Sequence, residues 1–294
     1  MARSALCPRL TQRKFAMIDI SKLFDTYSRQ ARLFPGLLTL FPIILTAIAL
    51  FPRLVTSSWG ATLVTLATSC GLLYGLSVLS RSRGKQVEKR LLKKWGSWPT
   101  TIWLRHREDH LPAPVLARYH AFFARNVPNF VAPTSTQEEA DPRAADGMYA
   151  GAVKWLQERC RGKDFTFVEK ENAEYGFRRN LRGLKPIGAT ACLAALAIAV
   201  MAILWRHDAI IPAISSGSLP MMISAFSVIK PAAIGAICVD LVALFAWATM
   251  VRDDWVREAG DQFARALLAC CDTIDIPQAV TSPKLATPQG ANTA

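Results

Sequence analysis

The sequence predicts an all-α integral membrane protein with four transmembrane helices and a helical cytoplasmic domain inserted between the second and third of them. Four long stretches are almost purely apolar, and each is close to the roughly 20 residues that a membrane-spanning helix needs. The charged residues are concentrated between these stretches. No convincing alternation of polar and apolar residues indicates a half-buried strand.

The apolar stretches pair into two transmembrane hairpins, residues 33–80 and residues 186–251. The predicted spans are residues 33–51, 60–80, 186–205 and 226–251. A short turn joins the first two, and an exposed loop over residues 206–225 joins the last two. Alanines at positions 191, 195 and 199 give the third span a stripe of small side chains, which lets helices approach closely.

The segments outside the hairpins are polar. Residues 1–32 read as a cytoplasmic tail that ends in an amphipathic helix. Residues 81–185 form the basic domain, which we expect to be mainly helical. Residues 252–274 continue the fourth span as an amphipathic helix, and residues 275–294 have the composition of a disordered tail. Met17 is an alternative start to Met1.

The distribution of charge predicts the topology. The chain carries a formal net charge of +13. Residues 1–32 hold seven Lys/Arg against two Asp, and residues 81–185 hold twenty-one against twelve Asp/Glu. The short connections between spans hold one basic residue each. By the positive-inside rule, both termini and the basic domain are cytoplasmic.

Motifs of catalysis are mostly missing from the sequence. It contains no GxxxxGK[ST], HExxH or GxSxG pattern and no serial metal-ligand spacing. We therefore expect no enzyme, no cofactor and no metal. A cluster of three histidines and two acids resembles a metal site, but two nearby prolines shorten its helix, so a solvated polar surface is favoured: His106, Glu108, Asp109, His110 and His120.

A basic and aromatic block over residues 81–107 is the candidate ligand-binding surface. Lys and Arg neutralise phosphates, and aromatic rings stack on unpaired bases. The same composition suits anionic lipid headgroups, and the positive-inside rule already demands some of this charge, so both alternatives remain. The candidate residues are Arg81, Arg83, Lys85, Lys89, Arg90, Lys93, Lys94, Trp95, Trp98, Trp103, Arg105 and Arg107.

A second basic block, residues 171–186, leads directly into the third span. It is either a helix anchored to headgroups or a coupler that transmits a rearrangement of the basic domain to the membrane. The candidate coupling residues are Tyr175, Arg178, Arg179, Arg182 and Lys185.

Asp240 and Lys230 are the candidate pore residues, the only acid and the only base within a predicted span. Ten residues separate them, about 15 Å along a helix, so they cannot pair within it. A ring of Asp240 carboxylates around a symmetry axis would favour cations. The alternative is a single hydrogen bond from Asp240 to a Ser, Thr or Tyr of another span.

Three stretches carry a family resemblance. Residues 171–188 match the pattern ENxxYGFRRNLxGLKPxG, and residues 32–45 read RLFPGLLTLFPIIL. Residues 98–101 and 104–107 resemble a third motif of the same family. Over residues 17–250 the chain resembles small bacterial four-span membrane proteins and is similar to the membrane effectors of the Hailong anti-phage defence system.

The resemblance implies a homo-oligomeric, multi-pass channel in the bacterial inner membrane. Its implied partner is a nucleotidyltransferase that makes short single-stranded DNA oligomers, which bind the effector and hold it closed. No ligand residue of the family can be matched to a position here.

The expected function is therefore a gated ion channel and defence effector controlled by a nucleic-acid-like ligand. A homo-oligomer, most simply a tetramer, is expected because four spans rarely enclose a conduit alone. The alternative is a non-conducting membrane scaffold that recruits a cytoplasmic enzyme. A small transporter is a less favoured function, because only one buried ionisable residue is available to couple transport to an ion.

Overall fold

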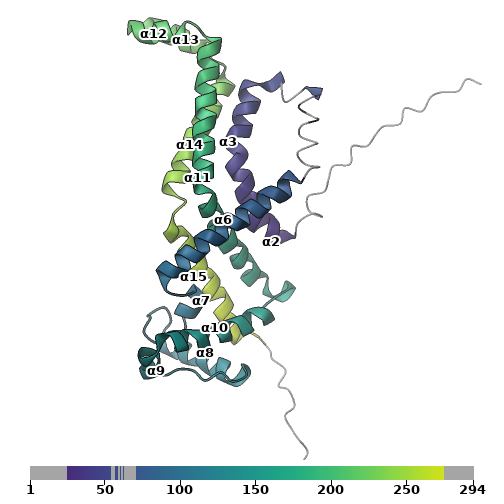
Figure 1. Ribbon diagram of the computed structural model, residues 1–294, viewed down its shortest axis with the longest axis vertical. Coiled ribbons are helices and arrows are strands. Elements are labelled where there is room, and N and C mark those ends of the chain that lie inside the picture. Colours follow the sequence, from purple (N-terminus) through teal and green to yellow (C-terminus); the bar gives the residue numbers. More distant parts are fainter. Residues whose placement is uncertain (1–24, 54–56, 59, 61, 63–70, 275–294) are drawn as a thin grey trace, which may run out of the picture.

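A computed structural model describes residues 25–53, 57–58, 60, 62 and 71–274, and every regular element in this part of the chain is helical (Figure 1). The predictions for the N-terminal tail, for the C-terminal tail over residues 275–294 and for most of the second span fall outside the described residues.

Three helices in the described part are long and apolar enough to cross a membrane. The first, Thr26–Leu50, runs from α2 through a π-helical turn into α3 (Phe34–Leu50) without a break. The others are α11 (Thr166–Arg206) and α14 (Pro231–Thr249). The chain is thus an all-helical membrane protein, and its first candidate span includes the described end of the expected surface helix.

These three helices lie side by side in Figure 1, with α11 in contact with both α3 and α14. The predicted alanine stripe of α11 is buried, and Ala195 and Ala199 are fully inaccessible. Gly188 faces the ring of Trp247 on α14, and a Cβ atom there would overlap that ring. Small residues on α11 therefore allow its neighbours to approach.

The described end of the predicted second span belongs to α6 (Leu72–Trp95), which begins after Gly71 in a left-handed conformation, with φ 74°. This helix continues without interruption into the basic block and crosses α11 in Figure 1. At the crossing, a Cβ atom on Gly183 would lie 2.6 Å from the carbonyl carbon of Arg83. Only glycine fits between two backbones this close.

The expected loop over residues 206–225 is instead largely helical, as α12 (Ile210–Ser216) and α13 (Leu219–Ser227). Pro212 and Pro220 both fall in the first turn of their helix, where a backbone N–H has no helical partner and proline is tolerated. The pair projects sideways at the top of Figure 1. The last span is correspondingly shorter than expected.

The polar domain at the other end is built from α7 (Pro99–Ile102), α8 (Ala113–Asn126), α9 (Ser135–Ala140) and α10 (Pro142–Arg159). The C-terminal helix α15 (Asp253–Ala269) shares their core. Phe123, Tyr149, Leu156 and Leu267 are fully buried in it. Because α6 leads into α7 and α15 follows α14 directly, this helical domain is connected to the spans through three helices, α6, α11 and α15.

Candidate functional site

The basic and aromatic block divides into an exposed part and a part committed to protein contacts. Five of its cations are exposed on α6 without an ion pair among the described residues: Arg81, Arg83, Lys89, Lys93 and Lys94. Lys85 instead pairs with Glu88 at 2.6 Å, and Arg90 with Asp253 at 2.9 Å. Trp95 is half-buried beneath the guanidinium of Arg257.

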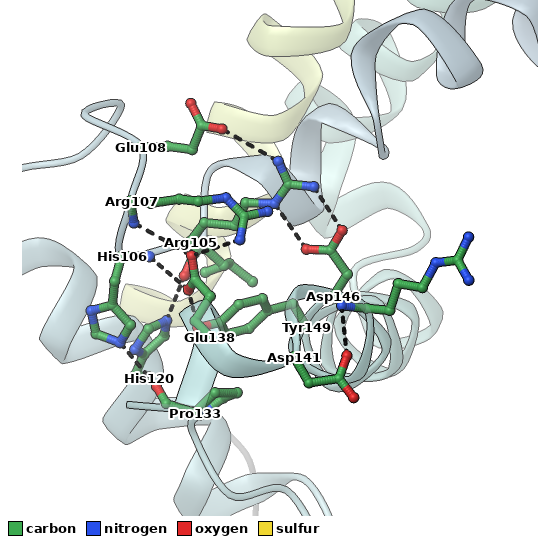
Figure 2. A network of polar contacts seen from close by, with 12 residues as sticks. Arg105, His106, Arg107, Glu108, His120, Pro133, Glu138, Asp141, Asp146 and Tyr149 are labelled. Carbon is green, nitrogen blue, oxygen red and sulfur yellow. Dashed lines mark hydrogen bonds and ion pairs between the residues drawn. The ribbon is translucent and has the colours of Figure 1, made fainter. Parts of the chain in front are cut away.

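Two predicted ligand arginines belong to the polar network of Figure 2. Arg105 is buried and donates two hydrogen bonds, of 2.8 and 2.6 Å, to Asp146, which raise the pKa of its guanidinium further. Glu138, almost completely buried, accepts from the backbone N–H of His106 at 2.9 Å and forms an ion pair with Arg107 at 3.4 Å. Both arginines therefore hold the helical domain together.

Trp103 is buried as well, and its indole N–H donates to Asp261 at 3.0 Å. The histidines of the metal hypothesis also have protein partners, since the Nε2 atom of His106 lies 3.0 Å from the carbonyl oxygen of Pro133. Among the described residues no three His, Cys, Asp or Glu side chains form a metal-binding group.

A buried ion pair joins α6 to α11. Arg179 hydrogen-bonds to Glu88, and each of the two side chains is only 7% exposed. The guanidinium also donates to Oδ1 of Asn180 at 3.1 Å, and the amide of Asn180 donates to the carbonyl oxygen of Ala31. Three segments, the start of the first span, α6 and α11, therefore meet at one polar cluster.

The remaining candidate coupling cations bind the junction of α14 and α15. Arg182 pairs with Asp253 at 2.8 Å, and Arg178 contacts Glu258 at 3.0 Å. The Nζ atom of Lys185 lies 3.0 Å from the carbonyl oxygen of Ala248, in the last turn of α14. Such carbonyls have no partner within their own helix. In the described part of the chain these cations therefore contact protein groups of α14 and α15, and the coupling role stays a prediction.

Asp240 is completely buried between the spans. Its Oδ2 atom accepts a 2.7 Å hydrogen bond from the hydroxyl of Thr46 on α3, while Oδ1 has no partner in the described part of the chain. This geometry matches the hydrogen-bond alternative. Lys230, the other candidate pore residue, is exposed and directly precedes the first residue of α14.

A cavity of about 520 Å³ opens between α6, α7, α10 and α11. Lys85, Lys154 and Arg179 line it together with a single acid, Glu88. Four aromatic residues line it as well: Tyr27, Trp98, Tyr175 and Phe263. Trp98, partly exposed, stands edge-on to Tyr175 at 6.4 Å between ring centroids.

The hydroxyl of Tyr175 is buried and has no hydrogen-bond partner among the described residues. Such an unpaired buried group gains free energy when a ligand completes its hydrogen bond. Three cations against one acid, with four aromatic rings, suit an anion that carries a flat ring. A volume of this size is within the range of small-molecule sites.

Several residues of these sites were not among the predicted ones: Thr46, Glu88, Lys154, Asn180 and Asp253. Glu88 had a usable signal, because it is the only acid in α6 among seven Lys/Arg. The others are ordinary polar residues whose importance arises only from their spatial partners.

A comparison of the chain with protein-family models, with curated proteins and with solved structures found no match.

Breaking the ion pair between α6 and α11 should destabilise the protein strongly. We expect Arg179→Met to lower the free energy of unfolding by about 3–5 kcal/mol, because Glu88 remains buried with one cation fewer. Adding Glu88→Leu to Arg179→Met should recover much of the loss. Thermal and denaturant unfolding in detergent micelles measures both.

The control is Arg118→Met, which removes an exposed ion pair with Asp272. Solvent screens an exposed pair, so its loss should cost little stability. A loss for Arg179→Met no larger than that of Arg118→Met would show that the buried pair does not hold the crossing together.

The helical domain should lose stability in mild acid through His120. Its Nε2 atom lies 2.9 Å from the carbonyl oxygen of Leu104, its ring stacks on Tyr149, and burial lowers its pKa. The unfolded chain therefore binds the proton first, and stability falls as the pH drops below about 6.5.

Melting temperatures at pH 7.5 and 5.5 test this expectation. His120→Gln should reduce the difference between the two temperatures, whereas the exposed His110→Gln should leave it intact. Equal pH responses in the wild-type protein and in both variants would contradict the role of His120.

Proposed function

We propose that the protein is an oligomeric ion channel of the bacterial inner membrane that acts as an anti-phage defence effector. Its gating ligand is a nucleic-acid-like anion, a short single-stranded DNA oligomer made by a partner nucleotidyltransferase, which binds the cytoplasmic helical domain. Both termini are cytoplasmic, and the conducting form is a homo-oligomer, with a tetramer as the simplest stoichiometry.

The observation that carries the proposal is the continuity of α11. This helix has 41 residues, about 60 Å at 1.5 Å per residue. Its first half lines the cavity through Asn172, Tyr175 and Arg179. Its second half packs between α3 and α14. A displacement caused by a ligand at the cavity is therefore transmitted to the spans along one continuous helix.

The charges of α11 supply the coupling. Arg179 is shared between the cavity and the ion pair with Glu88, so an anion in the cavity competes with Glu88 for the same guanidinium. Arg182 and Lys185, one and two turns further along, bind the junction of α14 and α15. A movement of Arg179 is thus transmitted to the end of α14, the helix that carries Asp240.

The described arrangement of Asp240 corresponds to a non-conducting state in this proposal. Thr46 donates to one carboxylate oxygen, and the other oxygen is buried among the described residues. A carboxylate at membrane depth needs a partner or water. Conduction then requires that α3 and α14 separate at this bond, so that Asp240 faces the conduit of the oligomer.

The non-conducting scaffold remains the second candidate, and one observation favours it. The exposed large side chains of the spans are apolar, such as Phe41, Ile44, Met201 and Phe245, and Asp240 does not lie among them. A purely lipid-facing exterior requires no conduit. Conduction measurements separate the two candidates.

Removing the hydroxyl that binds Asp240 should change ion flux. We expect Thr46→Val to raise the flux through liposomes containing the purified protein, because the carboxylate loses its partner within the chain. Flux of monovalent cations is measured with and without short single-stranded DNA oligomers.

The matched control is Thr39→Val on the same helix, whose buried hydroxyl donates to the carbonyl oxygen of Pro35 instead. This variant should conduct as the wild-type protein does. A wild-type protein that passes no ions under any of these conditions, with Thr46→Val equally silent, would favour the scaffold.

Binding of single-stranded DNA should depend on the exposed cations of α6. We expect the affinity to fall steeply with salt, and the triple variant Lys89→Gln/Lys93→Gln/Lys94→Gln to reduce the slope of log K against log salt by about 2, at roughly 0.7 per phosphate contact. Fluorescence anisotropy of a labelled oligomer measures this.

The triple variant Arg143→Gln/Arg159→Gln/Arg161→Gln removes the same charge from α10 and the turn after it, and it should keep the wild-type slope. If neither protein binds the oligomer at low salt, the nucleic-acid ligand is excluded and anionic lipid becomes the partner of the block.

A further inference from the structure

The two hairpin segments of the sequence, residues 33–80 and 186–251, contain only three Lys/Arg between them: Arg53, Arg206 and Lys230. All three line one hollow of about 590 Å³. They come from three different places in the chain, after the end of α3, at the end of α11 and before the start of α14. Three scarce charges that are far apart in sequence therefore converge on a single site.

These cations have no acidic partner among the residues that the structure describes. All three are exposed, and none forms an ion pair within the described part of the chain. The guanidinium of Arg206 lies over the ring of Phe51, 5.1 Å from its centroid. The remainder of the hollow is mainly apolar, with Leu50 and Ile203 among its lining residues. A positive rim over an apolar floor attracts an amphiphilic anion.

The hollow lies at the level where the three candidate spans end, at Leu50, Arg206 and Pro231. Lipid phosphates lie at this level, at the boundary of the hydrocarbon core. Trp205, which is 88% exposed, is next to Arg206 and has the position of an interfacial aromatic anchor. The site is therefore placed for a lipid headgroup.

A second hollow of about 490 Å³ adjoins the first and shares Phe51 and Arg206 with it. Its other lining residues are apolar: Ile198, Met201, Ala202 and Trp205. They lie on the last turns of α11, so this hollow extends from the cations back along the span. Such a groove accommodates an acyl chain.

We propose that this pair of hollows binds an anionic phospholipid of the leaflet at the α12–α13 end. The phosphate binds among Arg53, Arg206 and Lys230, and one acyl chain lies along Ile198 and Ala202. The lipid contacts the ends of α3, α11 and α14 together and so holds them at a fixed separation. The proposal does not depend on the channel or on its gating ligand.

Native mass spectrometry of the purified full chain tests the site, with equal amounts of phosphatidylglycerol and phosphatidylcholine added. We expect a retained phosphatidylglycerol in the wild-type protein. The variant Arg53→Gln/Arg206→Gln/Lys230→Gln should bind it at least tenfold more weakly, since each cation near a membrane surface contributes severalfold to the affinity. The control variant Arg143→Gln/Arg159→Gln/Arg161→Gln loses the same charge from α10 and the turn after it and should retain the lipid.

Two further measurements distinguish a lipid from a soluble anion. Ala202→Trp fills the apolar hollow without changing the charge, and it should weaken phosphatidylglycerol binding. Millimolar glycerol 3-phosphate should not displace the lipid. Displacement together with no effect of Ala202→Trp would assign the cations to a soluble phosphate and overturn the lipid site.

Equal loss of lipid in the two charge variants would also overturn the proposal, because general electrostatic attraction would then explain the binding. The melting temperature of each variant shows whether it is folded. If the triple variant is unfolded, Ala202→Trp and the single variant Lys230→Gln decide the question, and unchanged lipid binding in both would contradict the site.

Discussion

The ion pair of Glu88 with Arg179 is the constraint on which the rest of the structure depends. Two buried charges must be paired, since an unpaired one costs several kcal/mol. Gly84 and Gly183 bring the backbones of α6 and α11 close enough for the pair to form. The pair therefore fixes the register of α6 on α11, and Asn180 extends the same cluster to the first span at Ala31. The cavity between α6, α7, α10 and α11 lies beside this crossing, and Glu88 and Arg179 are among its lining residues.

Much of the fold was predictable from the sequence, because it depends on local patterns. The all-helical class, the membrane association and the alanine stripe of α11 follow from composition and spacing. The helices α12 and α13 were predicted as a loop, in a segment that contains Pro212 and Pro220. Proline in a first turn is compatible with a helix, and only the packing of Ile210 and Ala225 against the ends of the spans shows that helices form here.

The candidate site was harder to predict, because its partners are distant in sequence. Composition identified the basic block but could not tell exposed cations from paired ones. Arg105 is neutralised by Asp146, and Trp103 is held by Asp261, more than 150 residues away. Asp240 was found as an isolated acid, yet its partner Thr46 is 194 residues away and one of many hydroxyls in the spans. No period or motif encodes such a pair.

The two polar features of the membrane region constrain how α3 and α14 can move. Thr46 and Asp240 join these helices within the spans, and the hollow at Arg53, Arg206 and Lys230 lies where the helices end. With the proposed topology, these three cations lie at the outer surface, where the positive-inside rule does not call for them. A lipid bound there holds the outer ends together. In the proposed gating, α3 and α14 then separate from the cytoplasmic side, where Lys185 and Arg182 connect α11 to the end of α14 and the start of α15. The cavity lined by Arg179 lies on this side.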